Sequence, residues 1–295
     1  WIYEQTSPNS LSYTNSNYTH SIINTTQRNW TYISSPESHD GAIVDKRGLL
    51  TPLPQTWSID TWVSINNIVF SPSLSNQVNQ TLDKNGFIVT TTSKFQALKL
   101  VSKVFHDDHQ NLSIAFQENT IINTTDKPLS CSFFYAIRPY SPEGISAIDS
   151  LLYISNNAFV INNNLSIVFD QTPDNVICCS FKDGDVSNVI HNWEKIFQIN
   201  CPDQLASGLV EFKCTLDAFE EKSFSLKSLL NYSAGKSSLF MSKNHLNKQL
   251  QKDILKLKQL SVSASLAGLG KKVSPSMTTL CQIKLPDQKM EEVFN

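Results

Sequence analysis

The sequence predicts an all-β protein in which large antiparallel sheets pack face to face, followed by a C-terminal helical linker. Three observations support this fold class. Short runs rich in Val, Ile, Phe, Tyr and Thr recur from residue 29 to about residue 230, at intervals of about 8–12 residues. Clusters of Asn, Asp, Pro and Ser, which favour turns, separate these runs. After residue 238 the pattern changes to the three- and four-residue spacing of an amphipathic helix.

The clearest strand is predicted at 208–216. Val210 and Phe212 alternate there with Glu211 and Lys213, which is the two-residue period of a strand with one buried face.

The segment 131–138 (CSFFYAIR) is apolar on both faces, with Phe133 and Tyr135 on one and Phe134 and Ala136 on the other. A strand of this kind is covered on both sides, as in the middle of packed sheets. We therefore expect this strand at the centre of the domain.

Two turns are predicted from asparagines. The Asn-Gly pair at 85–86 separates two strand-like runs and is a strong hairpin signal. The triplet 162–164 (Asn-Asn-Asn) plays the same part further on, because Asn tolerates the positive φ values that tight turns require.

Two helices are expected. In the first, Asp185 is placed as an N-cap and apolar residues follow at helical spacing. These residues are Val189, Ile190, Trp193 and Ile196 or Phe197.

The second helix spans 242–260 and carries one apolar stripe, which should bury against the sandwich or against a following domain. The stripe consists of Leu246, Leu250, Ile254, Leu257 and Leu260.

The chain has 295 residues, enough for one large domain or two ordinary ones. Hydrophobic residues make up 40% and charged residues 17%, which supplies a sizeable core and excludes disorder across the whole chain. We predict a polar lead-in at 1–28, a β domain at 29–240 and a helical linker at 241–282. Residues 283–295 look like the start of a further helical domain.

The charge balance, Lys+Arg 24 against Asp+Glu 26, argues against nucleic acid as a partner, because phosphate contacts need a basic surface. No apolar run approaches the roughly 18 residues of a membrane-spanning helix, so no membrane partner is expected either.

The cysteines show no disulfide framework or metal-type spacing, so reduced thiols in a cytoplasmic protein are expected, with export left open. The six are Cys131, Cys178, Cys179, Cys201, Cys214 and Cys281. Against a cytoplasmic location stand eight N-x-S/T sequons, but such triplets arise by chance in a chain this rich in Asn, Ser and Thr.

No catalytic, metal or cofactor motif stands out. The segment 106–109 (His-Asp-Asp-His) has metal-ligand residue types but is expected to be a solvated turn. The segment 235–237 (Gly-Lys-Ser) lacks the first glycine of a phosphate-binding loop. Glycosidase chemistry needs two facing carboxylates, and sequence spacing brings no pair together. The acids considered are Asp60, Glu143, Asp149, Glu220 and Glu221.

Two segments are richer in special residues than a generic β domain requires: 45–62 (DKRGLLTPLPQTWSIDTW) and 136–146 (AIRPYSPEGIS). Their aromatic side chains suit sugar rings and domain interfaces alike. They can also be rigid turns at the ends of strands, without a ligand. The candidate carbohydrate or interface residues are Trp57, Trp62, Arg138, Tyr140, Glu143 and Asp60.

Arg138 is expected to be at least half buried and paired with Asp60 or Glu143, because a guanidinium suits a bidentate contact with a carboxylate. Two prolines stiffen the loop that follows, and Gly144 can supply a positive φ where the chain reverses. The pair would pin this loop to the segment 45–62.

The stretches RGLLTPLPQTWSIDTWV (47–63) and FFYAIRPYSPEGIS (133–146) resemble a group of bacterial glucoamylase-like proteins. These proteins have an N-terminal β-supersandwich, similar to that of galactose mutarotase, followed by an (α/α)6 six-hairpin barrel. The resemblance runs from about residue 29 to residue 153 and continues to residue 230 in pattern only. The stretch IKLPDQKMEEVF (283–294) resembles the opening of the first barrel helix.

The resemblance implies a β-supersandwich whose partner is the helical (α/α)6 domain of the same polypeptide, with oligosaccharide as a further ligand. In such enzymes the catalytic carboxylates lie in the barrel, so no catalytic residue is carried over to this chain. The resemblance therefore implies a non-catalytic N-terminal domain of a glycoside-hydrolase-like protein, with a structural role or a place at the rim of the substrate cleft.

Two alternatives remain open. The chain could be a free-standing carbohydrate-binding module that uses Trp57, Trp62 or Tyr140 as stacking platforms. It could also be a mutarotase-like sugar epimerase, although no matching histidine stands in a convincing strand context. A further helical sequence after residue 295 would favour the first hypothesis over both.

Overall fold

The computed structural model describes residues 30–35, 38, 40–75, 77–83, 87–109, 112–154, 157–190, 193–230, 243–262 and 265, and for residues 243–250 it describes the backbone alone. The predicted lead-in at 1–28 and the predicted start of a helical domain at 283–295 lie outside the described residues.

The first sheet has eight strands, in the order β1-β2-β3-β4-β10-β18-β16, with β5 paired to β4. Neighbouring strands are antiparallel throughout. The bounds are β1 (Trp30–Ile33), β2 (Ala42–Asp45), β3 (Leu50–Thr51), β4 (Ser58–Ile65), β5 (Ile68–Phe70), β10 (Leu129–Arg138), β16 (Asn175–Cys179) and β18 (Ser207–Leu216).

The second sheet has nine strands, in the order β17-β13-β14-β15-β19-β9-β8-β7-β6. It is also antiparallel. The bounds are β6 (Val78–Leu82), β7 (Ile88–Phe95), β8 (Leu98–His109), β9 (Leu112–Asn123), β13 (Ser150–Ile154), β14 (Ala158–Ile161), β15 (Asn164–Phe169), β17 (Gln198–Asn200) and β19 (Glu221–Leu229). A short ladder joins β11 (Tyr140–Ser141) to β12 (Gly144–Ile145).

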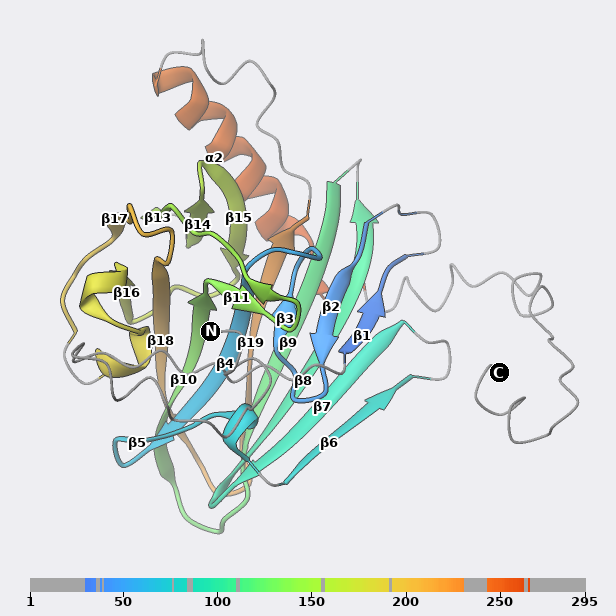
Figure 1. The fold of residues 1–295 in the computed structure, drawn as a ribbon. Coiled ribbons are helices and arrows are strands. Elements are labelled where there is room, and N and C mark those ends of the chain that lie inside the picture. Colours follow the sequence, from blue (N-terminus) through green and yellow to red (C-terminus); the bar gives the residue numbers. More distant parts are fainter. Residues whose placement is uncertain are drawn as a thin grey trace, which may run out of the picture.

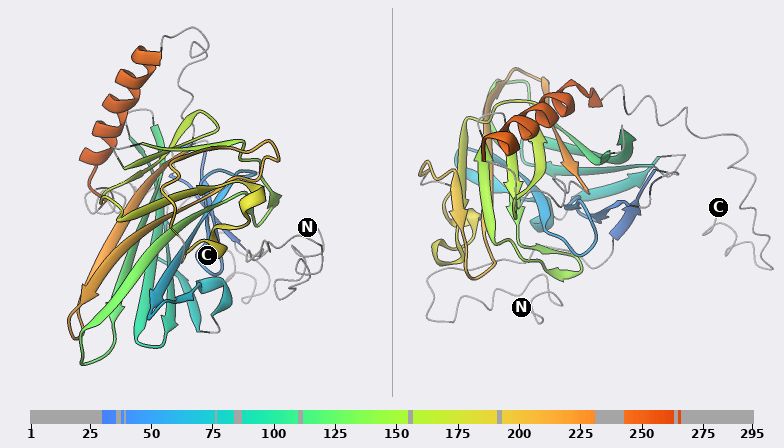
Figure 2. Two further views of the ribbon diagram at one scale, coloured as in Figure 1. Left: turned by 90° about the vertical axis from the view of Figure 1, so that its left-hand side faces the viewer. Right: turned by 90° about the horizontal axis from the view of Figure 1, so that it is seen from above.

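The two sheets pack face to face, so the predicted all-β sandwich is confirmed (Figure 1 and Figure 2). Aromatic rings from both sheets meet between the layers. The ring of Phe133 on β10 stacks on that of Phe224 on β19, with centroids 4.9 Å apart. Tyr135 on β10 donates its hydroxyl hydrogen to the Phe224 carbonyl, across 3.1 Å. Burial of these rings is the main contribution to the free energy of packing.

The strand at 131–138 is covered on both faces, as its sequence predicts. Phe133 and Tyr135 belong to the core between the sheets. Phe134 and Ala136 point to the opposite face, where they pack with Ile190 in a second apolar cluster. An irregular segment around residues 181–196 therefore forms a third layer over the eight-stranded sheet.

The turns follow the predicted chemistry. Asn162 and Asn163 have φ values of 49° and 66°, so both adopt the left-handed conformation that a tight hairpin turn requires. The Asn-Gly pair at 85–86 lies outside the described residues, but β6 and β7 pair on either side of it, with Leu82 opposite Val89.

The helix predicted after Asp185 is wrong. Asp185 does act as an N-cap, since its side chain accepts a hydrogen bond from the backbone N–H of Ser187. The turn it caps is a single 3-10 turn, η4 (Val186–Asn188). The apolar residues predicted for the helix cover the eight-stranded sheet from an irregular loop instead. The chain then continues into β17, which pairs with β13. Two further 3-10 turns are η2 (Pro72–Leu74) and η3 (Phe181–Asp183).

The C-terminal helix is confirmed as α2 (Lys243–Gln259). Ile254 and Leu257 are fully buried against Phe105, Phe116 and other apolar side chains on the outer face of the nine-stranded sheet. Figure 2 shows the helix lying along that face. The side chains of Leu246 and Leu250 are outside the described residues. Ile254 and Leu257, which belong to the described part of the predicted apolar stripe, thus pack on the sandwich.

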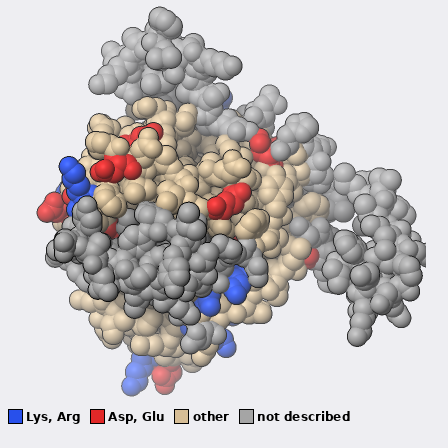
Figure 3. Space-filling view, viewed as in Figure 1, with Lys and Arg blue, Asp and Glu red and all other residues tan. Residues whose placement is uncertain are grey.

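Charged side chains of both signs are scattered over the face shown in Figure 3, and no patch of one sign stands out among the described residues there. No helix in the described ranges is long and apolar enough to cross a membrane.

Candidate functional site

Arg138 occupies the last position of β10 and is fully buried, at 1% exposure, as predicted. Its Nη2 lies 2.5 Å from Oδ2 of Asp185, while its Nη1 is 4.0 Å from Oδ2 of Asp60. The guanidinium stands over the rings of both Trp62, at 5.2 Å, and Tyr140, at 4.8 Å. Asp60 is thus a partner, as predicted, but the closer partner, Asp185, was not expected. We call these five residues the Arg138 cluster.

Burial is the largest single influence on the pKa values of Asp60 and Arg138. It raises the pKa of Asp60, although Arg138 and the hydrogen bond from Trp62 Nε1 act in the opposite direction. Burial lowers the pKa of Arg138, but Asp185, Tyr140 and Asp60 more than offset this, so the pKa is raised overall. The cation therefore persists and holds two carboxylates inside the protein, an arrangement that suits an architectural role.

Glu143 does not pair with Arg138, which corrects the second predicted partner. Its Oε2 accepts a hydrogen bond of 2.5 Å from the backbone N–H of Gln55. Gln55 has a φ of 62°, uncommon for a residue with a side chain. Ser146 Oγ donates to the Gln55 carbonyl across 3.3 Å. The segment 136–146 therefore does pin the segment 45–62, but through Glu143 and Ser146. Gly144 has a φ of 142°, the positive value predicted.

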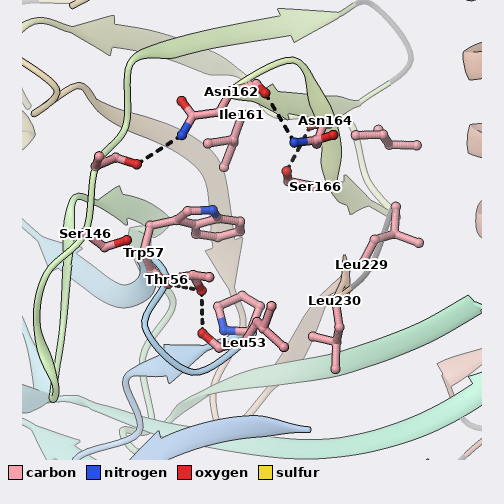
Figure 4. A pocket seen from close by; sticks show the side chains of 13 residues that line it. Leu53, Thr56, Trp57, Ser146, Ile161, Asn162, Asn164, Ser166, Leu229 and Leu230 are labelled. Atoms are coloured by element: carbon pink, nitrogen blue, oxygen red, sulfur yellow. Dashed lines mark hydrogen bonds between the residues drawn. The ribbon is translucent and has the colours of Figure 1, made fainter. Parts of the chain in front are cut away.

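Beside this pinned loop lies a cavity of about 500 Å³, within the usual range for small-molecule sites. We call it the Trp57 cavity. Figure 4 shows the indole of Trp57 pointing into it, with Leu229 and Leu230 on the opposite side. The described residues that line it are Pro52, Leu53, Thr56, Trp57, Ser146, Ala147, Ile161, Asn162, Asn164, Leu165, Ser166, Leu229 and Leu230.

The polar side chains of the cavity are held by local hydrogen bonds. Oδ1 of Asn162 accepts from the backbone N–H groups of Asp149 and Ser150, so its amide is committed to the fold. Asn164 Nδ2 donates to the Asn162 carbonyl, and Ser166 Oγ donates to the Asn164 carbonyl (Figure 4). The Ser166 hydroxyl oxygen and the Asn164 side-chain oxygen keep lone pairs that can accept from a ligand.

Trp57 is 9% exposed and belongs to the core between the sheets, which fixes the ring. It offers the cavity part of its surface and is not an open platform. Trp62 and Tyr140, the other two aromatic candidates, are buried at 4% and 0% exposure and contact Arg138. As the structure stands, neither presents a face to a sugar.

Three of the five acids considered for catalysis are engaged in structural contacts. Asp60 is buried in the Arg138 cluster, Glu143 holds Gln55, and Glu220 caps its own turn by accepting from the backbone N–H of Asp217. None of the described residues that line the Trp57 cavity carries an ionisable side chain.

The segment 106–109 is not a solvated turn, which corrects that expectation. It forms the end of β8, whose pairing with β9 continues to His109 opposite Leu112. His106 is buried: its Nδ1 accepts from the backbone N–H of Ser35, and its Nε2 lies 2.8 Å from Ser113 Oγ. No group of three or more metal-ligating side chains is found in the described part of the chain.

Sequence reasoning missed most of the cavity. The triplet 162–164 predicts only a turn, and the sequence analysis assigns no role to Leu229 and Leu230. The one available signal is the density of aromatic and proline residues around Trp57. The remaining walls come from segments about 90 to 170 positions away, which no local pattern connects.

No protein-family model matches the chain, and no curated protein matches it either. Solved structures do match. One is a protein from the human microbiome described as a kojibiose phosphorylase, with 11% identity, a TM-score of 0.44, and coverage of 87% of this chain and 32% of that one. A bacterial glucoamylase complexed with acarbose matches with 10% identity, a TM-score of 0.46, and coverage of 82% and 39%.

A polysaccharide lyase matches with 10% identity, a TM-score of 0.34, and coverage of 68% of this chain and 32% of that one. This chain thus spans about a third of the length of these proteins. With TM-scores below 0.5, the likenesses decide neither the fold nor the function of this chain.

Proposed function

We propose that this chain is a non-catalytic β-sandwich domain of a glycoside-hydrolase-like, carbohydrate-active protein, and that the Trp57 cavity binds part of a neutral saccharide. The observation that carries the proposal is the chemistry of the lining. Its described residues combine an indole, aliphatic side chains, hydroxyls and amides, and none of them is ionisable. Such walls suit an uncharged polyol with apolar ring faces, but they supply no acid, base or nucleophile.

The position of the cavity supports a place at the rim of a larger cleft. Leu165 and Leu229 line the cavity and also belong to the apolar cluster beneath α2. Leu230, the last described residue before α2, lines the cavity as well. A helical (α/α)6 domain that follows α2 in the same polypeptide is the partner we propose.

The test is a titration of the protein with maltotriose and with chitobiose, followed by NMR of the backbone amides. We expect shifts at the amides of Trp57, Asn164 and Ser166, with Kd on the order of 1 mM, equivalent to about −4 kcal/mol. Asn164→Ala should weaken binding several-fold by removing a polar group from the wall.

The matched control is Asn200→Ala, which changes another exposed asparagine of the same sheet, outside the cavity lining. It should bind as the wild type does. No amide shifts with either sugar, or equal affinity of the two variants, would contradict the proposal.

A mutarotase-like epimerase is the alternative from another class. It requires a histidine and a glutamate at a sugar site, and neither residue type is among the described residues that line the Trp57 cavity. Polarimetry of freshly dissolved α-glucose separates the two proposals. If the optical rotation changes at the same rate with and without protein, the binding role is supported. A faster change with catalytic amounts of protein would favour the epimerase.

A further inference from the structure

Two cysteines lie side by side on neighbouring strands of the eight-stranded sheet. Cys131 on β10 is directly opposite Cys214 on β18, and their Sγ atoms are 3.4 Å apart. Both are free thiols. Directly opposed residues of antiparallel strands have Cα atoms about 4.5–5.5 Å apart, which falls within the range that disulfides span. The backbone is therefore already placed for a cross-strand bond, and small rotations about χ1 would bring the sulfur atoms together.

The pair is open to small solutes. Both thiols line a cavity of about 690 Å³ that also contains Lys213 and Lys222. Cys214 is only partly buried. This cavity shares no lining residue with the Trp57 cavity, so the thiol pair is a separate site.

The two thiols differ in reactivity. A hydrogen bond from Cys131 lowers the pKa of Cys214, and the nearby Lys222 ammonium lowers it further, against the effect of burial. The same hydrogen bond, together with burial, raises the pKa of Cys131. Cys214 is therefore the better thiolate, and Cys131 is held next to it.

We propose that Cys131 and Cys214 form an oxidisable dithiol that closes a cross-strand disulfide by exchange with a low-molecular-weight disulfide. In the first step the Cys214 thiolate attacks one sulfur of the small disulfide, and a mixed disulfide forms as one small thiolate leaves. Cys131 then gives its proton to solvent and attacks Cys214 Sγ, and the second small thiolate leaves. Two protein thiols are oxidised and one small disulfide is reduced to two thiols.

The bond would join strands 83 positions apart in the sequence. A cross-link over so long a loop restricts the unfolded chain far more than the folded one, in which β10 and β18 are already paired. Oxidation should therefore raise Tm, by about 5–10 °C for a chain of this size, without changing the fold.

The test incubates the full chain with glutathione and glutathione disulfide in varied ratio, blocks the remaining thiols with iodoacetamide, and maps the peptides without reduction. The expected product is one cross-linked peptide pair, Cys131 with Cys214, that appears as the ratio becomes oxidising, together with the rise in Tm. Cys178 and Cys179 serve as controls in the same digest. They are fully buried, and burial raises the pKa of each to about 12.

Two variants separate the roles of the thiols. In the Cys131→Ser variant the exchange should stop at a stable mixed disulfide between Cys214 and glutathione, because the second thiol that would displace glutathione is missing. Cys214→Ser should react slowly and show no rise in Tm. The proposal fails if Cys131 and Cys214 are both alkylated under oxidising conditions, or if Cys178 and Cys179 oxidise at the same ratio.

Discussion

The Trp57 cavity and the Arg138 cluster both include residues of the segments 45–62 and 136–146, but they meet solvent in opposite ways. The cavity is open, and the described residues that line it carry no ionisable side chain. The cluster holds a guanidinium and two carboxylates and is closed, with Arg138 at 1% exposure. The same two segments thus contribute to an open cavity and to a closed cluster.

The difference comes from what covers each segment. Asp185, the N-cap of the 3-10 turn η4, forms the shorter of the two ion pairs of Arg138. No such element covers Trp57 among the described residues, so its indole contributes to a cavity wall. Aromatic and charged residues in a rigid turn are therefore not evidence for a binding site until the covering layer is known.

The largest effect is expected for Arg138→Met. This change leaves Asp60 and Asp185 buried without their cation, which should lower the free energy of unfolding by about 3–5 kcal/mol. Urea unfolding at pH 7, followed by circular dichroism, measures the loss. Lys213→Met is the control, because it removes a cation whose side chain is 61% exposed and lies 3.9 Å from Glu211. The control should change stability by less than about 0.5 kcal/mol. A loss below about 1 kcal/mol for Arg138→Met would show that the cluster is not architectural.

The next largest loss of stability is expected for removing a buried apolar side chain. It serves as a reference for the part of the Arg138→Met effect that comes from lost packing. Leu257→Ala should destabilise the chain by about 2–4 kcal/mol, because this α2 side chain is 1% exposed where the helix packs on the nine-stranded sheet. Leu255→Ala changes the same residue type on the same helix, but that side chain is 57% exposed. It should cost less than about 0.5 kcal/mol. Equal melting temperatures for the two variants would mean that α2 does not contribute to the stability of the sandwich.

The smallest effect concerns the ionisation of Asp60, whose pKa burial raises above its ordinary value of 3.8. The folded state then binds this proton more tightly than the unfolded state does. The stability linked to Asp60 is therefore present below pH 3.8 and is lost as the pH rises through the raised pKa. Asp60→Asn removes the titration.

The free energy of unfolding of both proteins should be measured from below pH 3.8 to above the raised pKa of Asp60. The stability of the Asn variant relative to wild type should rise with pH, by about 1.4 kcal/mol for each unit between the two pKa values. A difference that falls with pH would mean that Arg138 outweighs burial at Asp60.

Local patterns predicted the elements that depend on local physics. The alternation along 208–216, the doubly apolar strand at 131–138 and the spacing of α2 each correspond to an element of the structure. The segment after Asp185 shows where this fails. Its apolar spacing is helical, yet pairing of β17 with β13 and burial over Trp62 and Phe134 favour an irregular chain. Tertiary contacts outweighed a weak helical preference there.

The sequence by itself determined the fold class and the C-terminal helix, because periodicity and turn residues act within short stretches of chain. It also indicated the burial of Arg138, because two prolines stiffen the loop after it and a guanidinium suits a buried contact with a carboxylate. Only the tertiary structure decided that Asp185 is the closest partner of Arg138, that Glu143 binds Gln55 instead, and that Trp57 lines a cavity with Asn164 and Leu230. It also decided that Cys131 meets Cys214. These contacts join residues about 50 to 170 positions apart, and their geometry depends on the strand order of two sheets, which no local sequence pattern encodes.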